Sequence, residues 1–146
     1  MATTSFGCKI SCSDPLVPLT LRVRFDGREV AVLMPVPGDN DFVFEFEDTD
    51  QNQDHLLEFE LAGKQPEHTE VNDQGEITKD VTVSLTNKNF ESINIDTVME
   101  QCSVYHHDFN GSQPPIEDGF FGTMGCNGVV KFRFSTPIYL WMLENL

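Results

Sequence analysis

Oxygen-bearing side chains occupy alternate positions of the segment 48–54. They belong to Asp48, Asp50, Asn52 and Asp54. A tight loop with this spacing directs several oxygens toward one point, and proteins bind calcium through about six to eight such oxygens. The segment therefore predicts a candidate calcium site, with calcium as the cofactor.

The same segment departs from the helix-loop-helix calcium motif. Gln53 stands at the sixth position, where that motif has glycine, and Phe59 stands at the twelfth, where it has glutamate. A polar hairpin turn is the alternative interpretation, because aspartate and asparagine are typical turn residues. The acidic excess around the loop favours the calcium interpretation, since nine acidic residues and no Lys or Arg lie between Asp39 and Glu60.

Soft metal ligands form a second candidate group. They are Cys8, Cys12, Cys102, His106, His107 and Cys126. A structural zinc site is typical of closely paired ligands such as Cys-x-x-Cys, and this chain has no such pair. Buried free thiols are therefore the favoured interpretation, and zinc is the alternative.

Motifs of known catalytic sites are absent from the sequence. It contains no Gly-x-Ser-x-Gly, no His-Glu-x-x-His and no phosphate-binding glycine loop. His107 and Asp108 suggest part of an acid–base site, but neighbours on a strand point to opposite faces. We therefore expect a binding or structural protein and not an enzyme, although a glycosidase-like pair of carboxylates stays open.

The charge of the chain limits its partners. With 24 acidic and 9 basic residues, the net charge is −15. A protein that binds nucleic acid directly needs a cationic surface, so nucleic acid is excluded, and an anionic membrane surface is excluded for the same reason. A cation, a glycan or a protein partner, including self-association, remains compatible with this charge.

Alternating apolar residues predict an all-β fold. The expected strands are 18–25, 28–34, 41–47, 56–61, 81–85, 90–95 and 129–134. Asp26-Gly27 is typical of a hairpin turn between the first two strands. A long polar loop is expected over 63–78 and another over 108–128, whereas 97–105 suits either a strand or a helical turn. Short strands at this spacing predict an antiparallel, jelly-roll-like β-sandwich.

The C-terminal segment is almost wholly apolar. Thr136-Pro137 resembles a helix start, so we expect a short C-terminal helix, with a last buried strand as the alternative. If exposed, this segment is an interface for assembly, formed by Ile138, Tyr139, Trp141, Met142 and Leu143. Tyr105, Tyr139 and Trp141 also suit a sugar-stacking platform, although burial in the core is the favoured interpretation.

The chain is expected to form one domain. Residues 1–17 are interpreted as an N-terminal arm and 18–146 as a single β-sandwich domain. The segment 1–13 lacks the basic and apolar regions of a signal peptide, and no run of about 18 apolar residues is present. We therefore expect synthesis in a cytoplasm, with reduced cysteines.

Four segments carry a resemblance to known proteins. They are Asp108-Phe109-Asn110-Gly111, Met124-Gly125-Cys126-Asn127-Gly128, the stretch from Thr136 to Trp141, and the stretch from Gly63 to Thr69. These segments are similar to parts of small uncharacterised β-sandwich proteins of tailed marine phages, cyanophages especially. The resemblance implies synthesis in the host cytoplasm followed by a place in the virion, in decoration, tail or adhesion. A sandwich with an oxygen-rich loop is also similar, at the level of fold, to calcium-dependent carbohydrate-binding modules.

Three functions follow as hypotheses. The first is a non-enzymatic structural or adhesion module of a phage virion. The second is a calcium-dependent carbohydrate-binding module. The third is an inhibitor that mimics nucleic acid, in which one sheet would space carboxylates like phosphates along Glu45, Glu47, Asp48, Asp50, Glu58 and Glu60.

Overall fold

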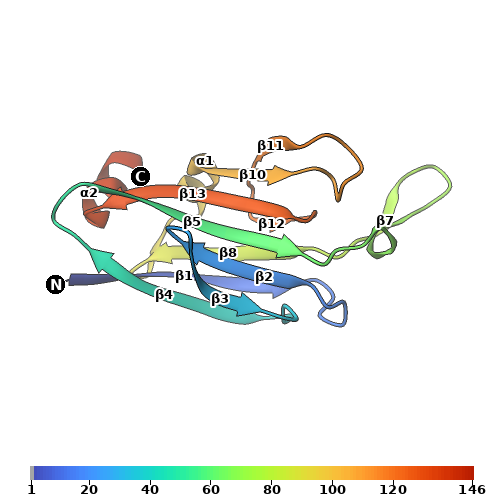
Figure 1. Cartoon of the computed structure of the whole chain (residues 1–146), viewed down its shortest axis with the longest axis horizontal. Helices are drawn as coiled ribbons and strands as arrows, with labels where there is room; N and C mark the ends of the chain where they lie inside the picture. The colour runs from blue at the N-terminus through green and yellow to red at the C-terminus, as the bar shows by residue number, and fades with distance from the viewer. Residues whose placement is uncertain (1) are drawn as a thin grey trace.

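Two antiparallel sheets stack face to face in a computed structural model that describes residues 2–146 (Figure 1). The five-stranded sheet has the order β12-β8-β1-β4, with β9 paired to β8. Its strands are β1 (Ala2–Cys12), β4 (Asn40–Asp48), β8 (Val83–Phe90), β9 (Ile93–Asn94) and β12 (Thr123–Met124). The prediction of an antiparallel, jelly-roll-like β-sandwich is confirmed.

The six-stranded sheet forms the second layer, with the order β11-β10-β13-β5-β2-β3. Its strands are β2 (Thr20–Phe25), β3 (Arg28–Leu33), β5 (Gln53–Ala62), β10 (Ser103–His107), β11 (Ile116–Gly119) and β13 (Gly128–Thr136). The strands expected at 18–25, 28–34, 41–47, 56–61 and 129–134 correspond to β2, β3, β4, β5 and β13. Apolar residues at every second position predicted these strands, because each strand has one apolar face.

Phenylalanine rings fill the space between the sheets. Phe6 of β1 contacts Phe59 of β5 and Phe90 of β8, with ring centroids 6.1 Å and 5.7 Å away. Phe46 of β4 lies 5.4 Å from Phe134 of β13. Tilted and edge-to-face arrangements of this kind add to the stabilisation that burial of the ring area supplies. The core therefore joins the two sheets through aromatic contacts.

The N-terminal segment differs from the prediction. Instead of an arm over 1–17, Ala2–Cys12 forms β1 between β4 and β8 within the five-stranded sheet. Phe6 and Ile10 are fully buried, and Cys8 and Cys12 lie on the same inner face. The prediction was wrong because cysteine behaves as a small apolar side chain here. Cys8 and Cys12 therefore continue the row of apolar inner-face residues, in a segment that was interpreted as polar. The sandwich thus includes residues that were assigned to the arm.

Strand β8 also differs from expectation. Two strands were expected at 81–85 and 90–95. The first continues as β8 to Phe90, and the second is reduced to the two-residue strand β9 within 90–95. Asn87 takes a positive φ of 51° within β8, and the turn to β9 has positive φ at Glu91 and Ser92. Asparagine tolerates this conformation better than most residues, and the β1–β8 register shifts beside it, between Thr86 and Asn89, without ending the strand.

The expected loops contain further short elements. The segment 63–78 holds the 3-10 helix η1 (Pro66–His68), β6 (Glu70–Val71) and the start of β7 (Ile77–Lys79), and the β6–β7 hairpin extends beyond one end of the sandwich (Figure 1). The ambiguous segment 97–105 contains both α1 (Asp96–Cys102) and the start of β10. Strands β11 and β12 interrupt the loop expected over 108–128.

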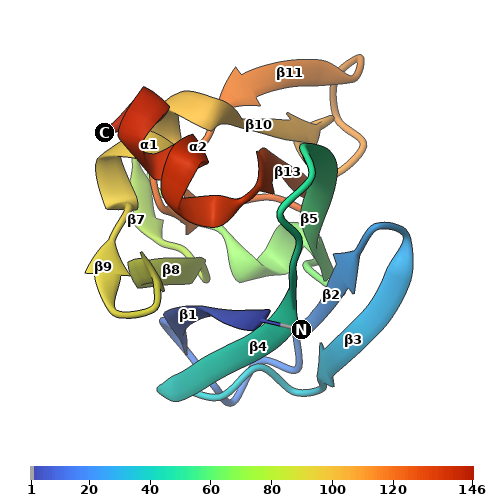
Figure 2. The ribbon, with the colours of Figure 1, turned by 90° about the vertical axis from the view of Figure 1, so that its left-hand side faces the viewer.

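A C-terminal helix, α2 (Ile138–Asn145), lies across the end of the sandwich opposite the β6–β7 hairpin (Figure 2). The helical interpretation is confirmed, but its expected start is shifted: Thr136 ends β13 and Pro137 is the N-cap. Trp141 packs edge-on against Phe90 and Phe132, at 5.8 Å and 5.7 Å between centroids. Neither helix of residues 2–146 has the length and apolar character to cross a membrane.

Candidate functional site

The loop predicted to bind calcium does not gather its four side chains. Asp48 ends β4, and its carboxylate accepts hydrogen bonds from the Thr4 hydroxyl at 2.7 Å and from the Ile138 backbone N–H at 3.0 Å. Its oxygens therefore join the first strand to the start of α2. Asp48 has a structural role at this position.

The other three predicted ligands are exposed. Asp50 and Asn52 lie in the turn between β4 and β5, and Asp54 lies on β5 opposite Ser135. Within residues 2–146, no three His, Cys, Asp or Glu side chains are grouped in a way that could hold a metal ion. The residues present do not fit a calcium site, and calcium binding at this loop stays a prediction.

The candidate zinc ligands are also spread over the fold. Cys8 and Cys12 are buried on β1, whereas Cys102 and Cys126 are half-buried elsewhere, and all four are free thiols. Burial raises the pKa of the Cys8 thiol to about 12, although the positive charge of Lys88 opposes this shift. A thiol with so high a pKa stays protonated at neutral pH and is a poor metal ligand.

The carboxylates of the nucleic-acid-mimic hypothesis lie on opposite surfaces. Glu45 and Glu47 face outward from β4 in the five-stranded sheet, whereas Glu58 and Glu60 face outward from β5 in the six-stranded sheet. The set therefore cannot form one phosphate-like row, and this part of the hypothesis is wrong.

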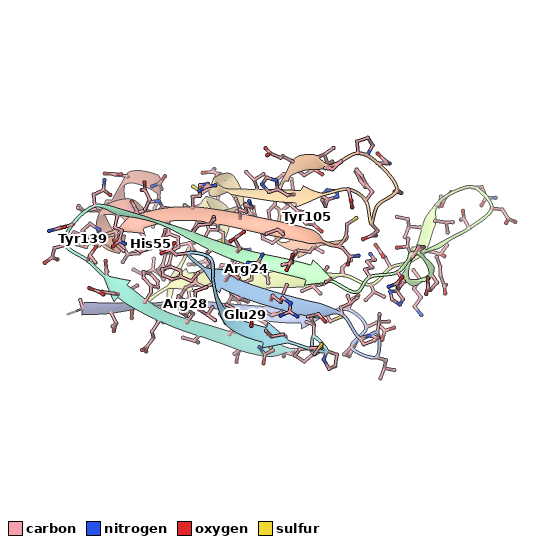
Figure 3. All side chains as sticks on the ribbon, viewed as in Figure 1. Arg24, Arg28, Glu29, His55, Tyr105 and Tyr139 are labelled. Atoms are coloured by element: carbon pink, nitrogen blue, oxygen red, sulfur yellow. The ribbon has the colours of Figure 1, made fainter. Side chains whose placement is uncertain are left out.

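The aromatic platform is not assembled either. Tyr105 faces the interior, Trp141 is buried against the core, and Tyr139 is exposed on α2. Figure 3 shows Tyr105 and Tyr139 far apart along the long axis of the molecule. These rings therefore do not share a sugar-stacking surface.

A cavity with a volume of about 620 Å³ lies on the outer surface of the six-stranded sheet, over β5, β13, β10 and β11. We call it the main cleft. Its polar lining residues are Glu60, His106, His107, Asp108, Glu117 and Asn127. Ala62, Pro115 and Ile116 supply apolar surface. Acceptors and apolar patches thus alternate around one concave surface.

Gly128 allows β10 and β13 to approach each other closely under the main cleft. A Cβ atom at this position would collide with the carbonyl oxygen of His106 and the Cβ of His107. Only glycine leaves room for this backbone contact, so the floor of the cleft depends on it.

Glu60 and His106 line the main cleft, and each has a partner on the strand next to its own. Arg24 of β2 donates a hydrogen bond to Glu60 of β5 at 3.0 Å. His106 and Glu117 are directly opposite in the β10–β11 pairing, and their Nδ1 and Oε1 atoms lie 3.5 Å apart. Cross-strand pairs of this kind hold the side chains of the cleft in place.

His107 supports one wall of the cleft. The backbone N–H of Phe109 donates to its Nδ1 at 3.3 Å, so Nδ1 must be the unprotonated nitrogen. Nε2 then carries the hydrogen and donates to Asp118 of β11 at 2.8 Å. Because both ring nitrogens are engaged, His107 positions β11 on β10 and has no free nitrogen to accept a proton from a substrate.

Asn127 fixes the other wall. Its side chain accepts from the backbone N–H of Lys64 at 2.9 Å and donates to the Lys64 carbonyl at 3.0 Å. Its own backbone N–H donates to the side chain of Asn110 at 2.7 Å. Three segments distant in sequence therefore meet at Asn127.

His106 and His107 were predicted from their residue types as metal or acid–base candidates, and Glu60 belongs to the acidic excess around the predicted calcium loop. Glu117 and Asn127 were not predicted as site residues. Asn127 lies in Met124–Gly128, which the phage resemblance marked without assigning a role. Glu117 carried no signal, because only the β10–β11 pairing brings it opposite His106.

The comparisons with known proteins concern the fold alone. No model of a protein family and no curated protein matches this chain. A solved structure of vCBM60 in complex with galactobiose is 14% identical with a TM-score of 0.45, over 88% of this chain and 96% of that one. The selenomethionine form of vCBM60, described with two families of calcium-dependent carbohydrate-binding modules, is 12% identical with a TM-score of 0.45, over 88% and 89% of the two chains. These values are too low to support an inference about function.

Proposed function

We propose that this chain is a non-catalytic binding module whose main cleft takes a glycan. The observation that carries the proposal is the composition of the cleft, where carboxylates, an imidazole and an amide surround apolar patches. Its volume of about 620 Å³ suits one or two sugar rings. Binding needs no metal in this proposal.

The chemistry of the lining favours a ligand rich in hydroxyl groups. Ionised Glu60 and Glu117 have acceptor oxygens only, so they bind groups that donate. Sugar hydroxyls donate in many directions, while the C–H faces of a sugar ring pack on apolar surface such as that of Pro115 and Ile116. A sugar therefore matches both halves of the lining.

Titration of isotope-labelled protein with neutral oligosaccharides tests this proposal. Binding should shift the backbone amide signals of β5, β10, β11 and β13 in NMR spectra. Glu117→Gln should weaken binding roughly tenfold, because it removes a charged acceptor. Glu45→Gln is the matched control on the outer face of the other sheet and should bind like the wild type. If a broad set of glycans leaves the cleft signals unmoved, the proposal is wrong.

A second candidate function is attachment to a larger protein assembly, which includes the virion role. The specific observation is the outer face of α2, where Tyr139, Leu143 and the following Leu146 are 59%, 75% and 63% exposed. An apolar surface of this kind on a short helix favours contact with another protein. Mass spectrometry of purified phage particles tests the virion role, and consistent absence of the chain from them would exclude it.

A further inference from the structure

A second cavity adjoins the main cleft on the same outer surface. Its volume is about 390 Å³, and it is lined by Cys102, Val104, His106, Glu117, Lys131 and Arg133. His106 and Glu117 also line the main cleft, so the two cavities are adjacent. We call the second one the cationic cavity, because Lys131 and Arg133 face it together.

Lys131 and Arg133 are neighbouring cations without an ion-pair partner. They lie two positions apart on β13, so both point to the same face of the sheet. Within residues 2–146, ion pairs engage Lys9, Arg22, Arg24, Lys64 and Lys88. The cations outside this set are Arg28, Lys79, Lys131 and Arg133, and of these only Lys131 and Arg133 share one strand. With 24 acidic residues available against 9 basic ones, two neighbouring cations without an acidic partner require an explanation.

Two carboxylates lie near these cations, and each has another partner. Glu117 lines the same cavity, where its carboxylate lies 3.5 Å from His106. Glu58 is opposite Lys131 in the β13–β5 pairing, but its carboxylate lies 3.9 Å from Arg24 on the other side. The partner of Arg133 in that pairing is Leu56, which has no charge. On the β10 side, Val104 is opposite Lys131. The neighbouring strands therefore leave the two cations facing the cavity.

We propose that the glycan bound by this chain is acidic, and that its carboxylate or sulfate group binds Lys131 and Arg133 in the cationic cavity. The inference rests on the proposed function, because the neutral part of the same ligand would occupy the main cleft. A guanidinium and an ammonium on one face match a sugar-borne anion, with arginine donating two parallel hydrogen bonds. The negative net charge of the chain does not prevent this, since exposed charges beyond about 8 Å are largely screened at physiological salt.

A third cavity extends the same surface toward α2. Its volume is about 390 Å³, and Arg133 lines it together with Asp54, Ser135 and Trp141. Each of the three cavities therefore shares at least one lining residue with the next. Adjacent cavities in this arrangement suit a chain of several sugar units better than a single sugar.

Isothermal titration calorimetry with matched probes tests the inference. The probes are trigalacturonate, its neutral methyl ester, a sulfated galactose oligosaccharide and inorganic sulfate alone. At least one acidic sugar should bind roughly tenfold more tightly than the methyl ester, and added salt should weaken that binding. The uronate and sulfated probes distinguish the two sources of negative charge. Sulfate alone should bind weakly, because it lacks the part that occupies the main cleft.

The double variant Lys131→Gln/Arg133→Gln should lose this preference and leave binding of the methyl ester within about twofold. Its control is Lys9→Gln/Arg22→Gln, which removes the same two units of charge from residues that already have acidic partners. Retained binding of acidic sugars by the control supports direct contact. If neutral and acidic sugars bind equally, or both double variants behave alike, the inference is overturned while the proposed function stands. If no sugar binds, the proposed function fails and the inference with it.

Discussion

The carboxylate of Asp48 accepts a hydrogen bond from the backbone N–H of Ile138 at 3.0 Å, although the two residues are 90 positions apart. Ile138 is the first residue of α2, and this N–H is one of those that a helix leaves without an internal partner. Asp48 also accepts from Thr4, so one side chain connects β1, β4 and α2.

Replacing Asp48 should destabilise the fold. We expect Asp48→Ala to lower the free energy of unfolding by about 2 kcal/mol, because a charged hydrogen bond at a helix start and one to a hydroxyl are both lost. Urea unfolding measures this change. Asp50→Ala, in the exposed turn nearby, is the control and should have an effect within about 0.5 kcal/mol.

The effect of calcium on the melting temperature is a second test of the same loop. A ligand that binds only the folded state raises the melting temperature. Because Asp48 is engaged by Thr4 and Ile138, we expect equal melting temperatures in calcium and in a chelator. A clear rise with calcium that Asp50→Ala removes would contradict this expectation and support the calcium site that the sequence predicted.

The buried pair Lys88–Asp96 should respond unequally to its two deletions. The Lys88 side chain is 2% exposed, donates to the carbonyl of Leu85 at 2.9 Å, and lies 3.2 Å from Asp96. Asp96→Ala leaves that ammonium without its counter-charge, at a cost of roughly 3 kcal/mol, whereas Lys88→Met removes the buried charge itself. Urea unfolding of both variants should find the first less stable than the second, and the reverse order would refute this account of the pair.

Stability should fall in acid through Asp80 and Asp96. Burial alone raises the pKa of each carboxyl, but the hydrogen bonds that each accepts, together with the charges of Lys64 and Lys88, lower both pKa values below the ordinary 3.8. A lowered pKa in the folded state means that the stabilisation is present above the unfolded pKa and is lost as pH falls through the folded pKa. Unfolding measured from neutral pH downward should therefore lose stability below about pH 4.

A variant identifies the residue behind that loss. Asp96→Asn keeps an acceptor for the backbone N–H of Lys88 but cannot titrate. Its stability should be lower than that of the wild type at neutral pH, and the difference should shrink in acid. An unchanged difference down to the lowest pH would show that Asp96 does not contribute to the acid sensitivity.

The cysteines should differ in their reactivity. Cys8 is 5% exposed with a pKa of about 12, and Cys12 is 3% exposed, so a reagent in solution does not reach either sulfur in the folded protein. A thiol reagent at mildly alkaline pH should label Cys102 and Cys126 first, and Cys8 and Cys12 only after unfolding. Mass spectrometry of the labelled peptides checks this order, and early labelling of Cys8 would contradict the burial of β1.

Substitutions on the two faces of α2 should have different effects: those on the buried face should lower stability, and those on the exposed face should reduce association. Trp141→Ala should cost roughly 3–5 kcal/mol, because the ring packs on Phe90 and Phe132. Leu143→Asp, on the exposed face, should leave urea unfolding nearly unchanged but reduce any self-association seen by light scattering. If the wild type is monomeric, self-association is excluded as the role of this face, and contact with another protein remains.

The predicted interface is thus divided by the tertiary structure. Ile138, Trp141 and Met142 are buried in the core, whereas Tyr139 and Leu143 are exposed. The apolar composition predicted contact for the whole segment, but a helix directs residues three and four apart to one face. Only the position of α2 against the sandwich decided which face is covered.

Strands and a helix were readable from the sequence because their signals are local. Phe42, Phe44 and Phe46 recur at every second position, with Glu45 and Glu47 on the opposite face, and this period predicted β4. The same period predicted β5 and β13. The central position of β1 was not readable, because it depends on pairing with β4 and β8, which follow much later in the chain. The main cleft was not readable either, because its lining residues come from segments that meet only when β5, β13, β10 and β11 pair. These residues include Glu60, His106, Glu117 and Asn127. The sequence by itself determined which face of each strand is apolar, because side chains of a strand point to opposite faces in alternation. The tertiary structure alone decided which strands lie side by side, and so which side chains line the cleft and which aspartate holds the last helix.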